Sequence, residues 1–332
     1  MTVQPQPASD SPLPLAGPLT AGDLLDRALR LYRSRFGLFL LTGAVLLIPL
    51  ALVSGLFLEP FFARYMLPFE VLMREPPGPE FDPFASSSDL FRDFASVTFI
   101  ILLLVAAGAI VYLSLAAQAV ATLRGGPLPL IAGLRRGLNR FLPYVGMMIA
   151  QLAAIAAAAV VILAPLLLLG IALLGLWVPS ASADEGGIFA ALGIAGLAVC
   201  GYSLAFLLVL APIVYLSARW LVAPAVLVVE RAGPIEALRR SWRLSRDNVL
   251  RMVGFLVALY ILETIFLSAP VVALQYAIML LMPSSGAFGL MMSLPTISSS
   301  LISIVGLPFF VAVVVLLYYD LRIRRNSYAL NP

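Results

Sequence analysis

The chain has 332 residues, of which 62% are hydrophobic and 11% charged, and its formal net charge is +4. Soluble domains carry about twice this charged fraction, and several apolar runs exceed about 18 residues, so the composition predicts an all-α polytopic membrane protein. Histidine is absent and Cys200 is the only cysteine. These two facts exclude internal disulfides, imidazole or thiolate metal clusters and histidine-based catalysis.

Residues 1–18 are rich in Pro, Ser and Ala and contain no basic residue, which predicts a disordered N-terminal tail. The spacing of Thr20 and Asp23 is typical of a capping box, and the helix that follows has its arginines on one side and its leucines on the other. We expect this helix to lie in the membrane interface and to lead into a first span at about 37–58.

Residues 59–93 have seven acidic residues, three arginines and many prolines, and are predicted to be a polar loop. A second span is expected at about 95–121, followed by a short basic interfacial helix that contains Arg135, Arg136 and Arg140. The apolar run at 142–178 exceeds the roughly 20 residues of one straight span, so we expect a kinked or tilted helix around Pro165. A re-entrant end to this run is left open.

An acidic linker at 179–187 separates this run from a fourth span at about 188–221. A third interfacial helix then begins at Pro234, which suits a first helical position because it has no N–H to leave unpaired. The fifth span is expected at about 252–281, a polar loop at about 283–295 and the sixth span at about 296–319. The polytopic domain then covers 19–325, and 326–332 form a C-terminal tail.

The distribution of arginine predicts the orientation. With the N-terminus inside, 18 arginines lie in internal segments and three lie in external loops, namely Arg64, Arg74 and Arg92. Because short cytoplasmic loops carry an excess of arginine, we expect both termini in the cytoplasm and the six spans in a bacterial plasma (inner) membrane.

A pattern of basic helix and span occurs three times along the chain. Arg35, Arg140 and Arg246 each close a basic helix, at intervals of 105 and 106 residues. The even spacing favours a pseudo-repeated bundle of the kind that many transporters use. However, any alternating topology places arginines at every second boundary, so the pattern leaves both interpretations open.

Glu263 is the acidic residue deepest within a predicted span. A carboxylate at that depth is costly unless it is neutral, paired or hydrated, so Glu263 is a candidate intramembrane functional site. The alternative is a structural role, in which a hydrogen-bonded glutamate bridges helices through Thr264, Gln118, Gln151 or Gln275.

Four arginines share one side of the helix that begins at Pro234. These candidate contacts for anionic lipid are Arg239, Arg240, Arg243 and Arg246. They are equally compatible with a topology anchor whose side chains reach the interface. The charges of the chain are dispersed beside membrane segments, so we expect no nucleic-acid partner.

Three stretches resemble the glycerophosphoryl diester phosphodiesterase membrane domain family. They are VVERAGPIEALRRSWRLSRDNVLRMVG at 228–254, LLYYDLRIRRNSYAL at 316–330 and LTAGDLLDRALRLYRSRFGLFL at 19–40. The family is named after proteins in which this membrane module is joined to a soluble phosphodiesterase domain, and we expect that domain to be missing here. The soluble domain uses histidines and metal-binding carboxylates, so no catalytic residue carries over to a chain without histidine.

The resemblance implies a membrane module linked to phospholipid or glycerophosphodiester metabolism. No span has an acid/base pair, a Ser-Lys arrangement or metal ligands, so we expect no enzymatic activity, cofactor or metal. The sequence therefore favours an accessory or scaffold protein that contacts the bilayer, anionic phospholipids and an unidentified protein partner. The alternative is a small-molecule or lipid transporter built as a six-helix bundle.

Overall fold

A computed structural model of the chain describes residues 19–74, 87–177, 185–281 and 287–330. The described residues are almost entirely helical and include no strand. In chain order the helices are α1 (Ala21–Ser34), α2 (Phe36–Arg74), α3 (Ser87–Leu123), α4 (Leu130–Trp177), α5 (Glu185–Trp220), α6 (Ala223–Val229), α7 (Pro234–Leu244), α8 (Val249–Glu263), a π-helical segment η2 (Thr264–Ser268), α9 (Ala269–Leu281) and α10 (Ala287–Leu330).

Six helical stretches in the described part of the chain are long and apolar enough to cross a membrane, which confirms the predicted number. They are Phe36–Gly55, Phe91–Leu123, Leu130–Leu166, Ser203–Val229, Val249–Ala277 and Leu301–Arg325. The protein is therefore a multi-pass all-α membrane protein by the length and composition of its helices.

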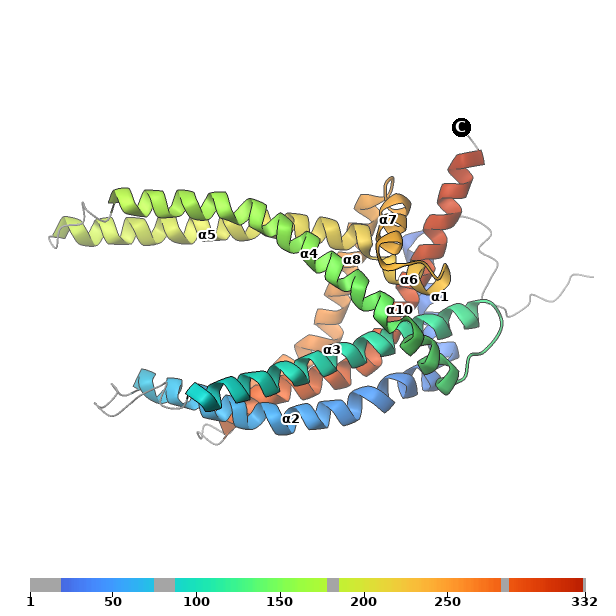
Figure 1. Ribbon diagram of the computed structural model, residues 1–332, viewed down its shortest axis with the longest axis horizontal. Helices are drawn as coiled ribbons and strands as arrows, with labels where there is room; N and C mark the ends of the chain where they lie inside the picture. The colour runs from blue at the N-terminus through green and yellow to red at the C-terminus, as the bar shows by residue number, and fades with distance from the viewer. Residues whose placement is uncertain (1–18, 75–86, 178–184, 282–286, 331–332) are drawn as a thin grey trace, which may run out of the picture.

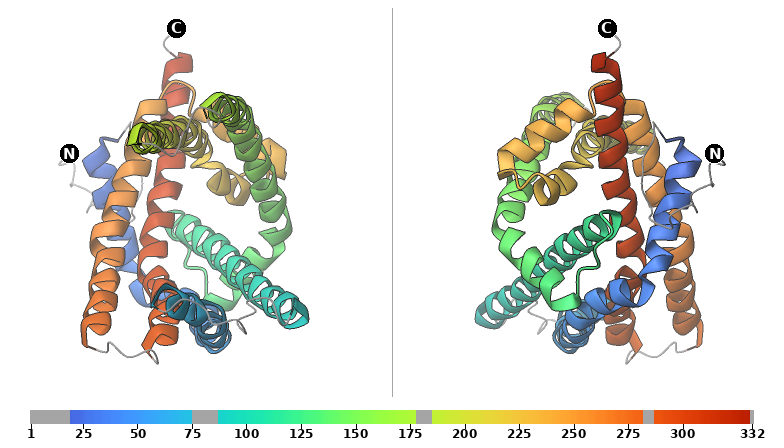
Figure 2. Two further views of the ribbon diagram at one scale, coloured as in Figure 1. Left: turned by 90° about the vertical axis from the view of Figure 1, so that its left-hand side faces the viewer. Right: turned by 90° about the vertical axis from the view of Figure 1, so that its right-hand side faces the viewer.

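Two arms extend from a common end of the molecule (Figure 1). One arm is the antiparallel pair α4 and α5, and the other contains α2, α3 and α10. The arms join where α1, α6, α7 and the C-terminal part of α10 lie. In both views of Figure 2, α10 runs between the continuous helix of α8 and α9 on one side and α3 and α4 on the other.

The hydrophobic core surrounds α10 near the junction of the two arms. Every side chain from Val311 to Tyr318 is buried, as is every side chain from Val111 to Val120 on α3. Over half (56%) of the most apolar window of the sixth span is buried, against 6% for the third span. Helix α10 is thus the central helix, whereas the apolar surface of α4 is left for lipid.

The two predicted helix starts are confirmed. The Thr20 hydroxyl accepts a hydrogen bond from the Asp23 amide, and the Asp23 carboxylate accepts one from the Thr20 amide, which completes the capping box of α1. Pro234 occupies the start of α7 after Gly233 as N-cap. Both features satisfy or remove amides that a helix leaves unpaired.

Two predicted loops and the predicted C-terminal tail differ from the structure. The predicted loop at 59–93 is wrong over 59–74 and 87–93, because α2 continues to Arg74 and α3 begins at Ser87. The Ala, Arg, Met and Leu residues between Pro60 and Pro68 have high helix propensity, so the helix continues through this segment. Helix α10 likewise begins within the predicted loop at 283–295 and continues through the predicted tail to Leu330.

The second basic helix is not a separate element. Arg135, Arg136 and Arg140 lie in the first turns of α4, which runs without a break from Leu130 to Trp177. Pro143 and Pro165 lie within α4, which changes direction along its length (Figure 1), as expected where proline removes a backbone hydrogen bond. No re-entrant turn interrupts residues 130–177. The predicted tail at 1–18 and most of the linker at 179–187 lie outside the described residues.

Candidate functional site

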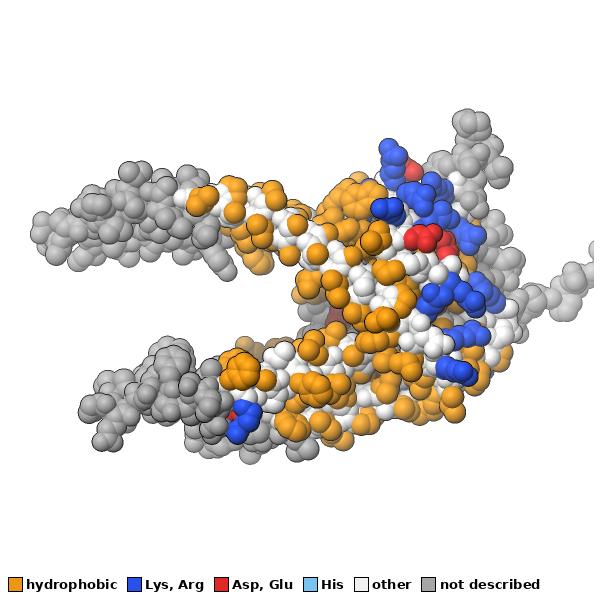
Figure 3. Space-filling model, in the orientation of Figure 1, with side chains coloured by type: hydrophobic (Ala, Val, Ile, Leu, Met, Phe, Trp, Pro, Cys, Tyr) orange, Lys and Arg blue, Asp and Glu red, His pale blue; other side chains and the backbone are white. Residues whose placement is uncertain are grey.

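Arginine side chains gather at the end where the two arms join (Figure 3). Helices α1, α6 and α7 and the first turns of α4 all lie at this end (Figure 1). Arg92 is far from it, because α3 begins at the opposite end of its arm and Arg92 lies near the start of α3. Among the described residues, this charged end is where arginine side chains that could bind an anion gather (Figure 3).

Helix α7 rests on the end of α5 at this surface. The hydroxyls of Ser241 and Ser245 donate hydrogen bonds of 2.8 and 3.3 Å to the carbonyl oxygen of Arg219. The apolar side of α7 was expected to lie among acyl chains, but Ala237, Leu238 and Leu244 are buried within the protein. The same holds for α1, whose buried residues are Leu24, Ala28 and Leu31. Both helices therefore gain stability from protein packing.

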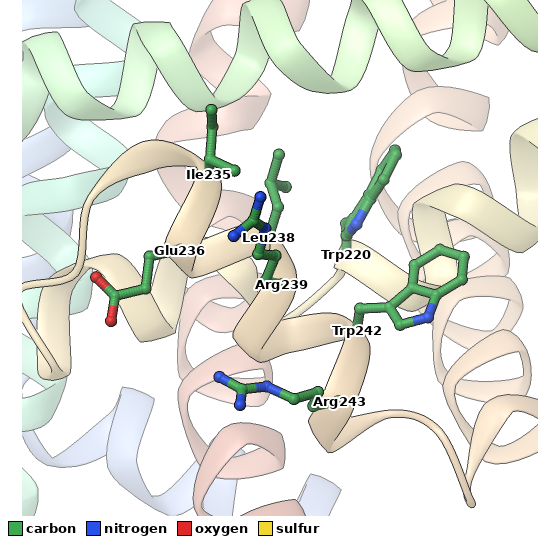
Figure 4. Close-up of a pocket in the computed structure, with 7 residues that line it drawn as sticks. All are labelled: Trp220, Ile235, Glu236, Leu238, Arg239, Trp242 and Arg243. Carbon is green, nitrogen blue, oxygen red and sulfur yellow. The ribbon is translucent and has the colours of Figure 1, made fainter.

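One side of α7 borders an open pocket of about 980 Å³, which we call the tryptophan pocket. Its lining residues are Trp220, Ile235, Glu236, Leu238, Arg239, Trp242 and Arg243. Figure 4 shows Ile235 and Leu238 extending from α7 toward α4, with the two tryptophans beside them. The indole rings are 6.1 Å apart. The pocket thus has an apolar floor and a rim of two arginines and one glutamate that is cationic overall, which suits an amphiphilic ligand.

A buried cation, Arg219, lies next to Trp242 of the tryptophan pocket. Arg219 is only 5% exposed, and its guanidinium carbon is 4.1 Å from the centre of the Trp242 ring and 5.6 Å from that of Tyr215. Its Nε and Nη1 atoms have no hydrogen-bond partner among the described residues. The aromatic faces provide the compensating attraction for this charge, so Trp242 is held in place by Arg219 on one side.

The four predicted lipid-contact arginines occupy different environments. Arg239 and Arg243 line the tryptophan pocket and are exposed. Arg240 is half-buried and lies 3.4 Å from the Glu230 carboxylate, so it connects α7 to the end of α6. Arg246 is exposed in the turn that follows α7. The structure therefore brings two of the four, Arg239 and Arg243, to one candidate site.

Glu263 ends α8 and precedes the π-helical segment η2, and it does not line the tryptophan pocket. Its side chain is exposed and forms no hydrogen bond or ion pair with a described residue. Of its suggested partners, Gln118 pairs with Thr42 and Thr264 donates to the carbonyl of Tyr260. π-Helical turns are rare and often mark functional positions, so Glu263 keeps its place as an intramembrane candidate.

Sequence reasoning missed a buried ionic cluster around Asp320. This carboxylate is fully buried and lies 3.1 Å from Arg251 and 3.0 Å from Arg324. It also accepts a hydrogen bond of 2.8 Å from the amide of Leu19, whose carbonyl receives hydrogen bonds from both arginines. The cluster ties the start of α1 to α8 and α10, which is a structural role. Its one local signal was the i, i+4 spacing of Asp320 and Arg324.

A second pocket at the charged end was also missed. Its volume is about 390 Å³, and it lies between α3, α4 and α6. Four arginines and one asparagine line it, together with an apolar wall, and no acidic residue does. The arginines come from three separate segments, so no local pattern in the sequence reveals their convergence.

No group of three His, Cys, Asp or Glu side chains that could hold a metal ion occurs among the described residues. The chain matches no protein-family model, and neither a curated protein nor a solved structure matches it. The resemblance to the glycerophosphoryl diester phosphodiesterase membrane domain family therefore stays a prediction based on three stretches of sequence.

Proposed function

We propose that the protein is a non-enzymatic membrane module that binds anionic phospholipid at its arginine-rich end, as an accessory or scaffold in membrane lipid or glycerophosphodiester handling. The tryptophan pocket carries this proposal. Its apolar floor of Ile235 and Leu238 suits an acyl chain, and Arg239 and Arg243 lie one helical turn apart where a phosphate would meet them.

The same proposal places the arginine-rich end on the cytoplasmic side of a bacterial plasma (inner) membrane. Support comes from the gathering of arginines at one end of the molecule (Figure 3) and from the excess of arginine in short cytoplasmic loops of membrane proteins. Anionic lipid in the cytoplasmic leaflet attracts juxtamembrane arginines by about 1 kcal/mol for each charge.

Native mass spectrometry of the protein released from nanodiscs tests this binding. With phosphatidylglycerol in the nanodisc, we expect the wild type to retain lipid and the double variant Arg239→Gln/Arg243→Gln to lose most of it. Arg240 is left unchanged because it pairs with Glu230. The matched control Arg27→Gln/Arg33→Gln removes two charges from α1 and should retain lipid. Equal retention by all three proteins would refute the proposed site.

A transporter is the second candidate, and one observation favours it. A wide opening separates the two arms in the space-filling view, and the visible side chains along it are mostly hydrophobic (Figure 3). Leu152 and Val161 of α4 are 68% and 72% exposed, so hydrocarbon must cover them in a bilayer. An opening of this kind would let lipid pass between leaflets.

A scrambling assay separates the two candidates. Proteoliposomes with fluorescently labelled phosphatidylglycerol are treated with dithionite, which bleaches only the outer leaflet. A lipid transporter would expose more than half of the label, and Glu263→Gln would reduce the rate if the carboxylate takes part. Bleaching that stops at half, as in protein-free vesicles, would leave the accessory module as the proposed function.

A further inference from the structure

The second pocket at the charged end plays no part in the lipid-binding proposal, and its lining is rich in arginine. We call it the four-arginine pocket. Its lining residues are Leu113, Ala117, Val120, Arg124, Arg136, Asn139, Arg140, Val228, Val229 and Arg231. It shares no residue with the tryptophan pocket, so the two sites can be tested separately.

Helix α3 supplies one wall that changes from apolar to cationic along its length. Leu113, Ala117, Val120 and Arg124 follow one another at intervals of four, three and four residues, which places them on one side of a helix. The first three are buried and Arg124 is exposed just after the last helical residue, Leu123. A ligand in this pocket thus meets hydrocarbon at one end and charge at the other.

Helix α4 supplies two arginines because it approaches α3 unusually closely. Gly133 and Gly137 face α3, and a Cβ atom on Gly137 would lie 2.7 Å from the carbonyl oxygen of Ile110. Glycines at i and i+4 permit this backbone approach. Arg136 and Arg140, also one turn apart, are thereby held at the edge of the α3 wall.

The segment after α6 supplies the fourth arginine in a strained conformation. Arg231 has a φ of +55°, a left-handed backbone that favours glycine and is uncommon for a side chain of this size. The carbonyl oxygen of Arg231 accepts a hydrogen bond of 3.3 Å from Nη1 of Arg140. This contact joins the segment after α6 to α4 at the pocket.

The charge in this pocket is not balanced within the described part of the chain. None of the four arginines forms an ion pair with a described acidic residue. Glu230 is next to Arg231 in sequence, but its carboxylate accepts a hydrogen bond of 2.7 Å from Tyr318 and lies 3.4 Å from Arg240. The lining therefore has four arginines and no acidic residue, so the site favours an anion with several charges and several acceptor oxygens.

We propose that the four-arginine pocket binds a phosphate group that carries two or more negative charges, as a phosphomonoester or a pyrophosphate does. Each guanidinium can donate two parallel hydrogen bonds to phosphate oxygens, and a doubly charged group gains more from four arginines than a singly charged phosphodiester does. At roughly 30 Å³ per water-sized group, the pocket has room for such a head group and the atoms next to it. The apolar wall of α3 then favours a lipid as the bearer of the phosphate.

Competition between two lipids tests the charge requirement. The full chain with Arg239→Gln/Arg243→Gln, which removes the cationic rim of the tryptophan pocket, is placed in nanodiscs that contain equal amounts of phosphatidic acid and phosphatidylglycerol with the same acyl chains. We expect native mass spectrometry to show one retained phosphatidic acid, preferred roughly tenfold over phosphatidylglycerol. Equal retention of the two lipids would overturn the proposal.

Two further variants in the same background separate binding from folding. Arg136→Gln removes a charge from α4, and Arg231→Gly removes a charge while relieving the left-handed strain. Both should lower the preference for phosphatidic acid to near parity, while the thermal midpoint of Arg231→Gly does not fall. The control Arg33→Gln should keep the full preference. If Arg33→Gln reduced the preference as much as Arg136→Gln, general surface charge would account for the binding and the pocket would not.

A soluble probe identifies the source of the phosphate. Inorganic pyrophosphate is titrated against the protein in nanodiscs of phosphatidylcholine alone. If Arg136→Gln weakens the binding of pyrophosphate and the protein also retains phosphatidic acid, the result supports a lipid ligand. Binding of pyrophosphate without retention of phosphatidic acid supports a soluble phosphate compound instead. If neither probe binds in an arginine-dependent way, the pocket is not a phosphate site.

Discussion

The guanidinium of Arg251 on α8 lies 3.1 Å from the buried carboxylate of Asp320 on α10. Arg324 reaches the same carboxylate oxygen, and both arginines also donate to the carbonyl of Leu19. This cluster holds the start of the described chain, the fifth span and the central helix together. It explains how the first and last helices come to lie side by side.

Asp320→Asn should destabilise the fold by about 3 kcal/mol, because two partly buried guanidinium groups lose their counter-charge. The free energy of unfolding in mixed micelles measures the effect. Asp26→Asn is the control, since Asp26 forms an exposed ion pair with Arg30 and its loss should cost below about 1 kcal/mol. Equal changes in the two variants would show that the buried cluster does not hold the helices together.

Acid should weaken the start of α1. Hydrogen bonds from the hydroxyl and the amide of Thr20 hold the pKa of Asp23 below its usual value. A group with a lowered folded pKa stabilises the fold above its unfolded pKa of about 4, and that contribution is lost as the pH falls through the folded pKa. Asp23→Asn should therefore flatten the pH dependence of amide exchange in α1 below about pH 4. An unchanged pH dependence in the variant would contradict a role for this cap.

The local features of the fold were predictable and the long-range ones were not. The capping box of Thr20 and Asp23 and the helix start at Pro234 depend on neighbouring residues, and the spans depend on apolar length alone. Residues 59–74 were predicted as a loop because prolines and charges were given more weight than the helix-forming residues between them. A helix boundary within α4 was expected at Arg140, but no residue there stops the helix.

The candidate sites were predictable only where a single helix carries them. Arg239 and Arg243 share one side of α7, so their proximity follows from helical spacing. Arg124 and Arg231 come from segments far apart in the chain, and only the packing of α3, α4 and α6 brings them together. No pattern within one segment predicts such a pocket.

Gly137→Ala should push α3 and α4 apart. The new methyl group would overlap the hydroxyl of Ser114 and the carbonyl of Ile110, both part of a buried helix. We expect a loss of about 1–3 kcal/mol in the free energy of unfolding, as in other overpacked cores. Gly170→Ala on the same helix is the control, because nothing lies within 4 Å of the added methyl group, and it should be neutral or stabilising. Similar losses for both variants would mean that helix–helix contact at Gly137 is not the cause.

Glu263→Gln should leave the fold intact or stabilise it slightly. Glu263 has no partner among the described residues, and a neutral amide is less costly at membrane depth than a carboxylate. The thermal midpoint in nanodiscs should thus stay equal to or rise above that of the wild type, in contrast to Asp320→Asn. A fall comparable to that of Asp320→Asn would reveal a structural partner and return Glu263 to the helix-bridging role. An unchanged midpoint combined with slower lipid scrambling would instead assign the carboxylate beside the π-helical turn to transport.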